Sequence, residues 1–356
     1  MGIYLDMPLD LTSLSITPEF LKIIAELDEF RGSWIALGRL APERLTALRK
    51  VATIESVGSS TRIEGSKLSD AQVEGLLGRI DVARFETRDE QEVAGYADVM
   101  ETVFLHARNI DLSINYILQL HRDLLKHSDK DERHRGRFKT MPNHVSAFDP
   151  EGNEVGVVFE TATPFDTPRL MEELVERTNE ELESGYYHPL LVIGIFTVAF
   201  LEIHPFQDGN GRLSRILTVL LLLRSGYTYV PYASIESVIE AAKERYYIAL
   251  RQTQRTIRSP RPDWQPFLQF FLETLLSHKQ NLAAKLEGEH RLLKALPPLA
   301  LQILDLAKAH GRLSNAQVVT LTGANRNTVK KHLAALVGAG QLVREGQGKG
   351  TRYGLG

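Results

Sequence analysis

The most informative part of this sequence is Leu201–Arg215, which reads LEIHPFQDGNGRLSR. An apolar helical run ends at Ile203, and we expect a second helix to begin near Arg212. Between them lies Asp208–Gly211 (DGNG), whose residues tolerate positive φ and let the backbone curl. A Gly-Asn-Gly turn that opens a helix directs several backbone N–H groups at one point, and the helix dipole adds to their attraction for an anion. The sequence therefore predicts a phosphate-binding turn here.

The side chains around this turn suit nucleotide chemistry. Arg212 and Arg215 lie three positions apart on one helical face and can both contact phosphate oxygens. Asp208 offers a hard oxygen ligand for Mg²⁺, and His204 can be a neutral base at pH 7. Phe206 is apolar within a polar loop, so we expect it to point inward and anchor the loop to the core.

Each of these features is weak alone. A histidine before proline is more often structural, an isolated Gly-Asn-Gly is usually a turn, and two helical arginines are usually solvated. Their conjunction within twelve positions is what departs from chance. No competing signature occurs: G-x-x-x-x-G-K-[ST], H-E-x-x-H, G-x-S-x-G and G-x-G-x-x-G are all absent.

Composition narrows the class of protein. The chain has 356 residues, 43% hydrophobic and 24% charged, which is an ordinary globular composition with room for two or three domains. The absence of cysteine excludes disulfide scaffolds, thiolate zinc sites, iron–sulfur clusters and cysteine nucleophiles. Met1–Asp10 has no signal-peptide pattern, and the apolar runs Pro189–Phe200 and Ile216–Leu223 are too short to span a bilayer. We therefore expect a cytoplasmic protein without membrane contact.

The chain reads as mainly α-helical. Apolar residues recur at helical spacing in nine segments, namely Phe20–Phe30, Pro42–Val57, Asp89–Leu105, Ile114–Leu125, Leu170–Leu182, Pro189–Leu201, Leu213–Leu223, Ile235–Ile257 and Trp264–Leu293. Arg135–Pro150 instead carries turn residues around short extended runs, which predicts a β-hairpin or exposed flap. We expect three parts: an N-terminal helical region (1–85), a catalytic core (86–296) and a C-terminal domain (297–356), the last boundary marked by two prolines after a long helical run.

The last sixty residues resemble a winged helix-turn-helix domain. Helices are expected over 299–309, 314–321 and 325–337, followed by a two-stranded wing over 342–344 and 351–353. Eight Lys/Arg stand against two acidic residues in this part. Because the third helix of such domains can enter the major groove, the residues that would face DNA are Arg326, Asn327, Thr328, Lys330 and Lys331. A dimerisation or peptide-docking role for this domain stays open.

The segment His204–Arg215 matches, at every defined position, the pattern H-P-F-x-[DE]-G-N-G-R-x-x-R, and in this segment the chain resembles the Fic family. The resemblance implies a helical core and the transfer of AMP from ATP to a Ser, Thr or Tyr hydroxyl of a target protein. The intact Gly-Asn-Gly-Arg argues against the related Doc-type kinases, whose loop departs there.

The resemblance also implies roles for individual residues. His204 would be the general base, and Asp208 would hold Mg²⁺ on the α- and β-phosphates. Arg212 would bind the β-phosphate and Arg215 the γ-phosphate. The other residues expected around the ATP are Gly209, Asn210, Gly211, Leu213 and Ser214.

Two further segments fit this interpretation. The Arg135–Pro150 hairpin lies where the family carries its flap, which holds the target by backbone pairing; Asn143, His144 and Val145 would border the active site. Glu244–Leu250 resembles the family helix whose aromatic residue packs near the adenine. Tyr247 is expected in that role, although it and its neighbour Tyr246 could equally be core residues.

An inhibitory helix is expected ahead of the core. Thr53–Glu64 reads as a helix that ends at Gly65, and Ser60–Gly65 (STRIEG) matches the inhibitory pattern [ST]-x-x-x-E-[GN] of the family. The resemblance implies that Glu64 pairs with Arg215 and occupies the γ-phosphate position, so that ATP binds unproductively. The alternative is an ordinary surface ion pair, which would stabilise the fold little.

Three functions therefore stay open at this point. The first is a self-inhibited protein adenylyltransferase that acts on a target protein and on itself, with a homodimer kept open. The second is a DNA-binding regulator whose core senses nucleotide. The third is an enzyme that removes AMP with a water oriented by Glu64.

Overall fold

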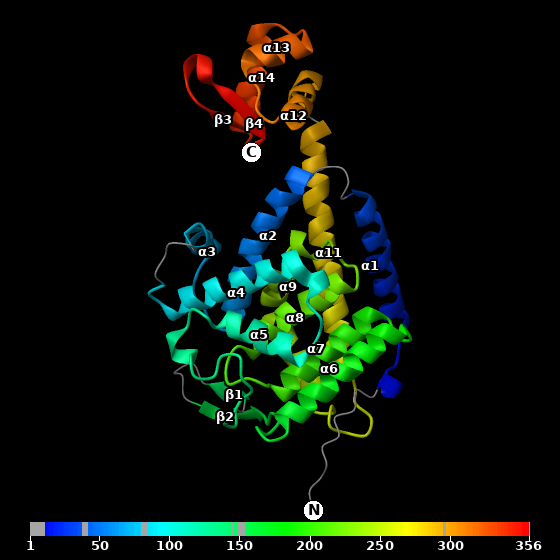
Figure 1. Ribbon diagram of the computed structural model, residues 1–356. Coiled ribbons are helices and arrows are strands. Elements are labelled where there is room, and N and C mark those ends of the chain that lie inside the picture. The colour runs from blue at the N-terminus through cyan, green and yellow to red at the C-terminus, as the bar shows by residue number, and fades with distance from the viewer. Residues whose placement is uncertain are drawn as a thin grey trace, which may run out of the picture. The chain divides into compact units, whose positions relative to one another are not determined.

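The computed structural model describes residues 11–37, 42–79, 85–143, 145–148, 154–294 and 297–355 (Figure 1). The chain is mainly α-helical, as expected. It forms two compact units that divide between Asn281 and Leu282, within helix α11 (Gln265–Lys294). The expected division into three parts stays a prediction.

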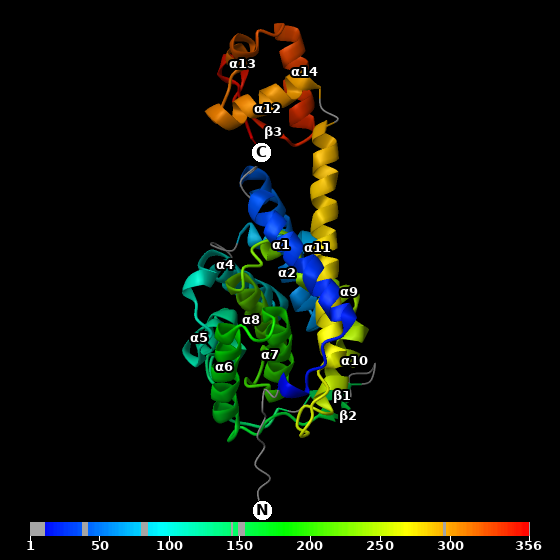
Figure 2. The same cartoon turned by 90° about the vertical axis from the view of Figure 1, so that its right-hand side faces the viewer.

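The first unit is built around two adjacent helices, α7 (Pro189–Ile203) and α8 (Asn210–Arg224), which run side by side in Figures 1 and 2. Helix α6 (Thr167–Ser184) packs against α7, and α2 (Pro42–Ile63) packs against α4 (Arg88–His106) and α9 (Ile235–Ala241). The remaining helices of this unit are α1 (Pro18–Leu37), α3 (Asp70–Leu77), α5 (Ile114–Leu124), α10 (Lys243–Gln254) and the first part of α11.

Helix α7 is enclosed on every face, and its sequence is apolar except at Thr197 and Glu202. All its residues from Leu190 to Ile203 are buried, which is the pattern of a helix enclosed by protein. Pro189 occupies the first helical position, where its missing N–H costs nothing, and the His188 ring accepts a hydrogen bond from the N–H of Leu190. Across the described residues, no helix combines the length and apolar character that crossing a membrane requires.

Two helical segments differ from expectation. The single helix expected over Ile235–Ile257 is broken into α9 and α10 at Ala242, whose φ of −113° and ψ of 28° lie outside the helical region. The apolar periodicity continues across this break, so periodicity alone misses it. Helix α3 was not predicted, although Ser69 and Gln72 form a capping box at its start.

The predicted hairpin exists but lies later in the chain. Strand β1 (Val145–Phe148) pairs antiparallel with β2 (Glu154–Phe159), from Val145 opposite Phe159 to Phe148 opposite Glu154. Only β1 falls within the predicted span of 135–150. No strand lies over 135–143, where Gly136 has a φ of 70° and the N–H of Lys139 donates to the carbonyl of Pro205 instead of to a neighbouring strand.

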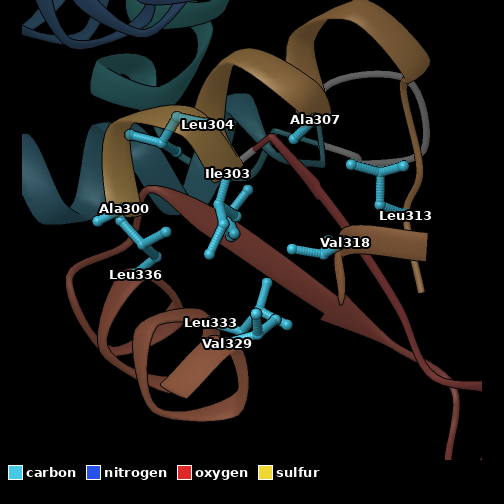
Figure 3. Close-up of a cluster of buried hydrophobic side chains, with 10 residues drawn as sticks. Ala300, Ile303, Leu304, Ala307, Leu313, Val318, Val329, Leu333 and Leu336 are labelled. Carbon is cyan, nitrogen blue, oxygen red and sulfur yellow. The ribbon is translucent and has the colours of Figure 1, made fainter. Parts of the chain in front are cut away.

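The second unit has its own core. Helices α12 (Pro298–His310), α13 (Asn315–Thr322) and α14 (Arg326–Gly338) precede an antiparallel hairpin of β3 (Leu342–Glu345) and β4 (Arg352–Leu355). Buried apolar side chains such as Ile303, Val318 and Leu333 meet between the three helices (Figure 3). This order of elements agrees with the expected one; the assignment to the winged helix-turn-helix class stays a prediction.

Candidate active site

The candidate base, His204, stands at the end of α7 in a strained backbone conformation. Its φ of 52° and ψ of 60° are left-handed, and no other non-glycine residue in the described part of the chain has a positive φ. The ring nitrogen Nδ1 lies 3.3 Å from the carbonyl oxygen of Leu201. Because a carbonyl only accepts, Nδ1 carries the proton and Nε2 carries the lone pair. Burial, aided by the Lys139 charge, lowers the pKa of His204 to about 4, so the ring is neutral at pH 7.

The turn after His204 is held by side chains of its own. Phe206 is fully buried, as expected, and its N–H donates to Asn210 Oδ1 over 2.9 Å. Asn210 Nδ2 returns a bond of 2.7 Å to the carbonyl of Phe206. Gly209 has a φ of 80°, and α8 begins at Asn210, two residues earlier than expected. The first N–H groups of a helix lack partners within it, so the start of α8 offers free N–H groups where the sequence predicts an anion-binding turn.

Asp208 lies in a ring of alternating charges. Its Oδ2 is 2.8 Å from Arg88 Nη2, and its Oδ1 is 3.3 Å from Arg212 Nη2. Glu92 contacts both arginines, at 2.8 Å from Arg88 Nε and 3.2 Å from Arg212 Nη1. Burial opposes ionisation of Asp208, but Arg212, the N–H of Gly209 and Arg88 outweigh it, and the pKa of Asp208 is lowered. Asp208 is therefore an ionised carboxylate at pH 7.

The side chains at this turn can hold Mg²⁺ only together with the phosphates of a bound nucleotide. Among the described residues, no group of three or more His, Cys, Asp or Glu side chains could hold a metal ion by itself. Mg²⁺ in nucleotide sites is commonly held by one or two carboxylates together with substrate phosphates and water. One ionised carboxylate beside the predicted phosphate-binding turn fits that arrangement.

Glu64 and Arg215 form the ion pair that the sequence predicted. Arg215 is 4% exposed, and its Nη2 lies 2.9 Å from Glu64 Oε1. Arg215 also donates to Ser60, from Nε to Oγ at 2.8 Å and from Nη2 to the carbonyl at 2.9 Å. A Cβ added at Gly211 would collide with the Glu64 carboxylate. Glu64 therefore covers the first turn of α8.

The end of α2 is anchored by Arg62. Its Nε and Nη2 bind the two oxygens of Glu240 in α9 at 2.6 and 2.9 Å, and its Nη1 binds Asp70 of α3 at 2.8 Å. Gly65 follows with a φ of 108°, a conformation that suits glycine. Glu64 is thus held between a fixed helix end and a sharp turn.

The two candidate tyrosines occupy different environments. Tyr246 is buried and packs against Phe267 and Phe270, with ring centroids 6.4 and 5.7 Å away. Tyr247 is half-buried, and burial together with the charge of Glu64 raises its pKa. Tyr247 is therefore the more exposed of the two, and its expected place near the adenine stays a prediction.

The remaining residues predicted for the site lie in α8 and at the start of the hairpin. Leu213 and Ser214 are buried in the core. Asn143 turns its side chain toward the loop and donates from Nδ2 to the carbonyl of Phe206 over 2.5 Å. Val145 begins β1, and His144 lies outside the described residues.

His121 of α5 is one of the residues of the site that sequence analysis missed. Its Nδ1 accepts from the N–H of Gly136 at 2.9 Å, so Nε2 donates to the carbonyl of Asp208 at 3.0 Å. Its ring stacks on Phe206 with centroids 3.7 Å apart, and burial lowers its pKa to about 4. Its position on the buried face of α5 predicts only a core histidine.

Comparisons with known proteins agree with the resemblance to the Fic family. Residues 111–222 match the family model described as Fic/DOC family. The chain is 28% identical over 252 residues to the protein adenylyltransferase Fic of Drosophila willistoni, covering 70% of this chain and 45% of that protein. It is 29% identical over 231 residues to the protein of the same name from Drosophila melanogaster, covering 64% and 42%. The chain thus spans less than half the length of the curated relatives it matches.

Solved structures share the fold. A Fic family protein from Desulfovibrio desulfuricans G20 superposes with a TM-score of 0.62 at 24% identity, covering 97% of this chain and 98% of that one. A Fic domain-containing signalling protein from Bacteroides thetaiotaomicron gives 0.59 at 23% identity, covering 74% and 97%. The match of residues 111–222 to the Fic/DOC family model agrees with the resemblance that the His204–Arg215 motif indicated.

Proposed function

We propose that this chain is a protein adenylyltransferase, which transfers AMP from Mg-ATP to Ser, Thr or Tyr hydroxyls of a target protein and of itself, and that Glu64 holds it in an inhibited state. The observation that carries the proposal is the arrangement at the start of α8. A neutral histidine, an anion-binding turn and a buried arginine paired with Glu64 converge there.

The reaction needs little covalent chemistry from the protein. The hydroxyl oxygen of the target attacks the α-phosphorus, the bond from that phosphorus to the bridging oxygen breaks, and diphosphate leaves. His204 accepts the hydroxyl proton at Nε2, because Nδ1 donates to Leu201. The N–H groups at the start of α8 and Arg212 stabilise the phosphate charge. Mg²⁺, held by Asp208, would neutralise charge on the α- and β-phosphates.

The inhibition follows from competition for one guanidinium. Arg215 would bind the γ-phosphate, but its Nη2 is taken by Glu64 at 2.9 Å. A carboxylate and a phosphate both seek the same donors and repel each other. Glu64 therefore keeps the γ-phosphate from its productive position.

The position of the label in ATP tests this function. With Mg-ATP labelled at the α-phosphate, we expect the Glu64→Gly chain to place label in protein acceptors of a cell lysate or in itself, and to place none with ATP labelled at the γ-phosphate. Label from the γ-phosphate would instead mean a Doc-type kinase. Absence of label from both would favour a nucleotide sensor, and loss of AMP from a prelabelled protein would favour AMP removal.

The metal assignment gives a first prediction. Asp208→Ala should reduce the Mg²⁺-dependent gain in ATP affinity about tenfold or more, since losing even an indirect partner of a metal ligand costs 10–100-fold. Binding of metal-free ATP should change little, because the turn and Arg212 remain. Titration calorimetry with and without Mg²⁺ measures both. Asp98→Ala, which breaks an ion pair with Lys126, is the control; equal losses for Asp208→Ala in both conditions would reject the assignment.

A second activity, DNA binding, is proposed for the second unit. Arg326, Asn327, Thr328, Lys330 and Lys331 are all exposed on α14, whose opposite face is buried in the core of that unit. An exposed row of basic residues on one helix is the footprint of a phosphate-binding surface.

Salt dependence tests this surface. Affinity for duplex DNA should fall as salt rises, and the slope of log K against log salt should flatten by roughly 0.9 for each phosphate that the protein no longer neutralises. Replacing Arg326, Lys330 and Lys331 by alanine together should therefore flatten it by about 2–3. Arg312→Gln removes a charge already paired with Glu345 and should change the slope far less. No binding at low salt would leave a docking or dimerisation module.

A further inference from the structure

The loop that carries His204 is fastened to the segment ahead of the hairpin. The N–H of Lys139 donates to the carbonyl of Pro205 at 2.9 Å, and its Nζ donates to the carbonyl of Ile203 at 3.0 Å. Asn143 Nδ2 lies 2.5 Å from the carbonyl oxygen of Phe206 and 3.5 Å from that of His204. Two residues thus contact four successive carbonyls.

Lys139 also joins the two ends of the hairpin. Besides Ile203, its Nζ donates to Asn143 Oδ1, before β1, at 2.8 Å and to Thr161 Oγ1, after β2, at 2.9 Å. An ammonium has three protons, and these three acceptors match them. The side chain is 2% exposed, so water cannot replace these partners.

Lys139 is charged at neutral pH. Burial lowers its pKa to about 8, the nearby Arg258 adds to the lowering, and Glu202 opposes it. Glu202 is paired with Arg258 at 2.8 Å. Its bond to the carbonyl of Ile203 places this ammonium at the C-terminal end of α7. There the helix dipole favours a positive charge, and the last carbonyls lack helical partners.

The catalytic loop needs such support. His204 is left-handed, a conformation that costs free energy in a non-glycine residue and persists only when its surroundings determine it fully. A base that lies an ångström from its productive position can lose about two orders of magnitude in rate.

We propose that Lys139 is a positioning residue for His204: it caps the end of α7 and, with Asn143, ties both ends of the hairpin to the loop that carries the base. This inference rests on the proposed adenylyltransferase function. Docking of a target on the hairpin and alignment of the base then depend on the same side chain.

Lys139→Met tests the proposal, because it keeps the length of the side chain and removes its donors. In a Glu64→Gly background, the maximal rate of α-phosphate label transfer, to the chain itself and to a fixed amount of lysate protein, should fall roughly 10–100-fold. The KM for Mg-ATP should stay within about twofold, since the turn at the start of α8 is untouched. Amide hydrogen exchange at His204 and Phe206 should become faster.

A second variant and a control make the result specific. Asn143→Asp keeps the acceptor toward Lys139 and removes the donor to Phe206 and His204, so it should slow transfer and speed exchange in the same way. Lys279→Met breaks an ion pair of a half-buried lysine with Glu26, 2.7 Å away, and should leave both measurements unchanged.

The outcomes test the positioning role of Lys139 separately from the proposed adenylyltransferase function. Unchanged exchange at His204 and Phe206 in the folded Lys139→Met and Asn143→Asp variants overturns the positioning role, and so does a raised KM with an unchanged maximal rate. If the Glu64→Gly chain itself transfers no label, the proposed function fails, while hydrogen exchange still tests how Lys139 and Asn143 hold the loop.

Discussion

Replacing Glu64 by glycine is expected to raise the rate of AMP transfer about 10- to 100-fold. A hydrogen bond between charged groups contributes about 1.5–3 kcal/mol, and each 1.4 kcal/mol of released competition changes the productive population about tenfold. Arg215 keeps its two bonds to Ser60 in this variant, so its guanidinium stays oriented. The measurement is the initial rate of AMP incorporation at equal ATP, parent against variant.

Two companion variants separate charge from bulk. Glu64→Gln keeps the side chain over Gly211 but removes its negative charge, so it should activate less than Glu64→Gly. Glu74→Ala, at an exposed acidic residue of α3, should leave the rate unchanged. Unchanged or lower incorporation with Glu64→Gly in a folded chain would remove the inhibitory role. It would leave Glu64 as an ordinary ion-pair partner or as a residue for AMP removal.

Replacing His204 should abolish transfer while the chain still binds nucleotide. A positioned general base contributes about 10²–10⁴-fold, and the first turn of α8 that receives the phosphates is untouched. Both His204→Ala and His204→Asn should show this loss in a Glu64→Gly background. Asparagine tolerates the left-handed backbone of this position, so the second variant separates loss of the base from loss of loop geometry.

The control is a histidine outside the loop. His127→Ala breaks a contact of 2.9 Å with Asp98 and should leave transfer within a few-fold of the reference. ATP affinity, measured by titration calorimetry, should match the reference for both His204 variants. Transfer by His204→Asn at a rate within a few-fold of the reference would show that another group accepts the proton.

Most of the correct predictions about the site depend on short stretches of neighbouring residues. The turn at Gly209, the inward Phe206 and the helix end before Gly65 each depend on the preferences of a few neighbouring residues. Contacts between residues far apart in the sequence were harder to predict, except where both residues belonged to a recognised motif. Glu64 and Arg215 are 151 positions apart, yet they could be paired because both belong to recognisable patterns.

Two of the residues that sequence reasoning missed contact the backbone of distant residues. His121 and Lys139 bind carbonyls of the catalytic loop from 87 and 64 positions away. Every residue has the same backbone carbonyl. The residue types of the loop therefore do not indicate which distant side chain binds it. The hairpin was misplaced for a related reason: the backbone of Lys139 bonds to Pro205, and that partner cannot be read from residues 135–143 alone.

The helical core was predictable where burial has a clear period. Helix α7 is buried from Leu190 to Ile203, and its bounds were predicted nearly to the residue. The break between α9 and α10 was missed because apolar positions continue through Ala242 while only its backbone departs. Periodicity thus reports which residues are buried and does not report where a helix bends.

Intact mass measurement tests the central claim most directly. The Glu64→Gly chain, incubated with Mg-ATP, should gain the mass of one or more AMP groups, and the unchanged chain should gain far less. The Glu64→Gly, His204→Ala double variant should gain none. An equal gain of AMP in the unchanged chain and in the Glu64→Gly chain, or a full gain in the double variant, would contradict an adenylyltransferase restrained by Glu64 and driven by His204.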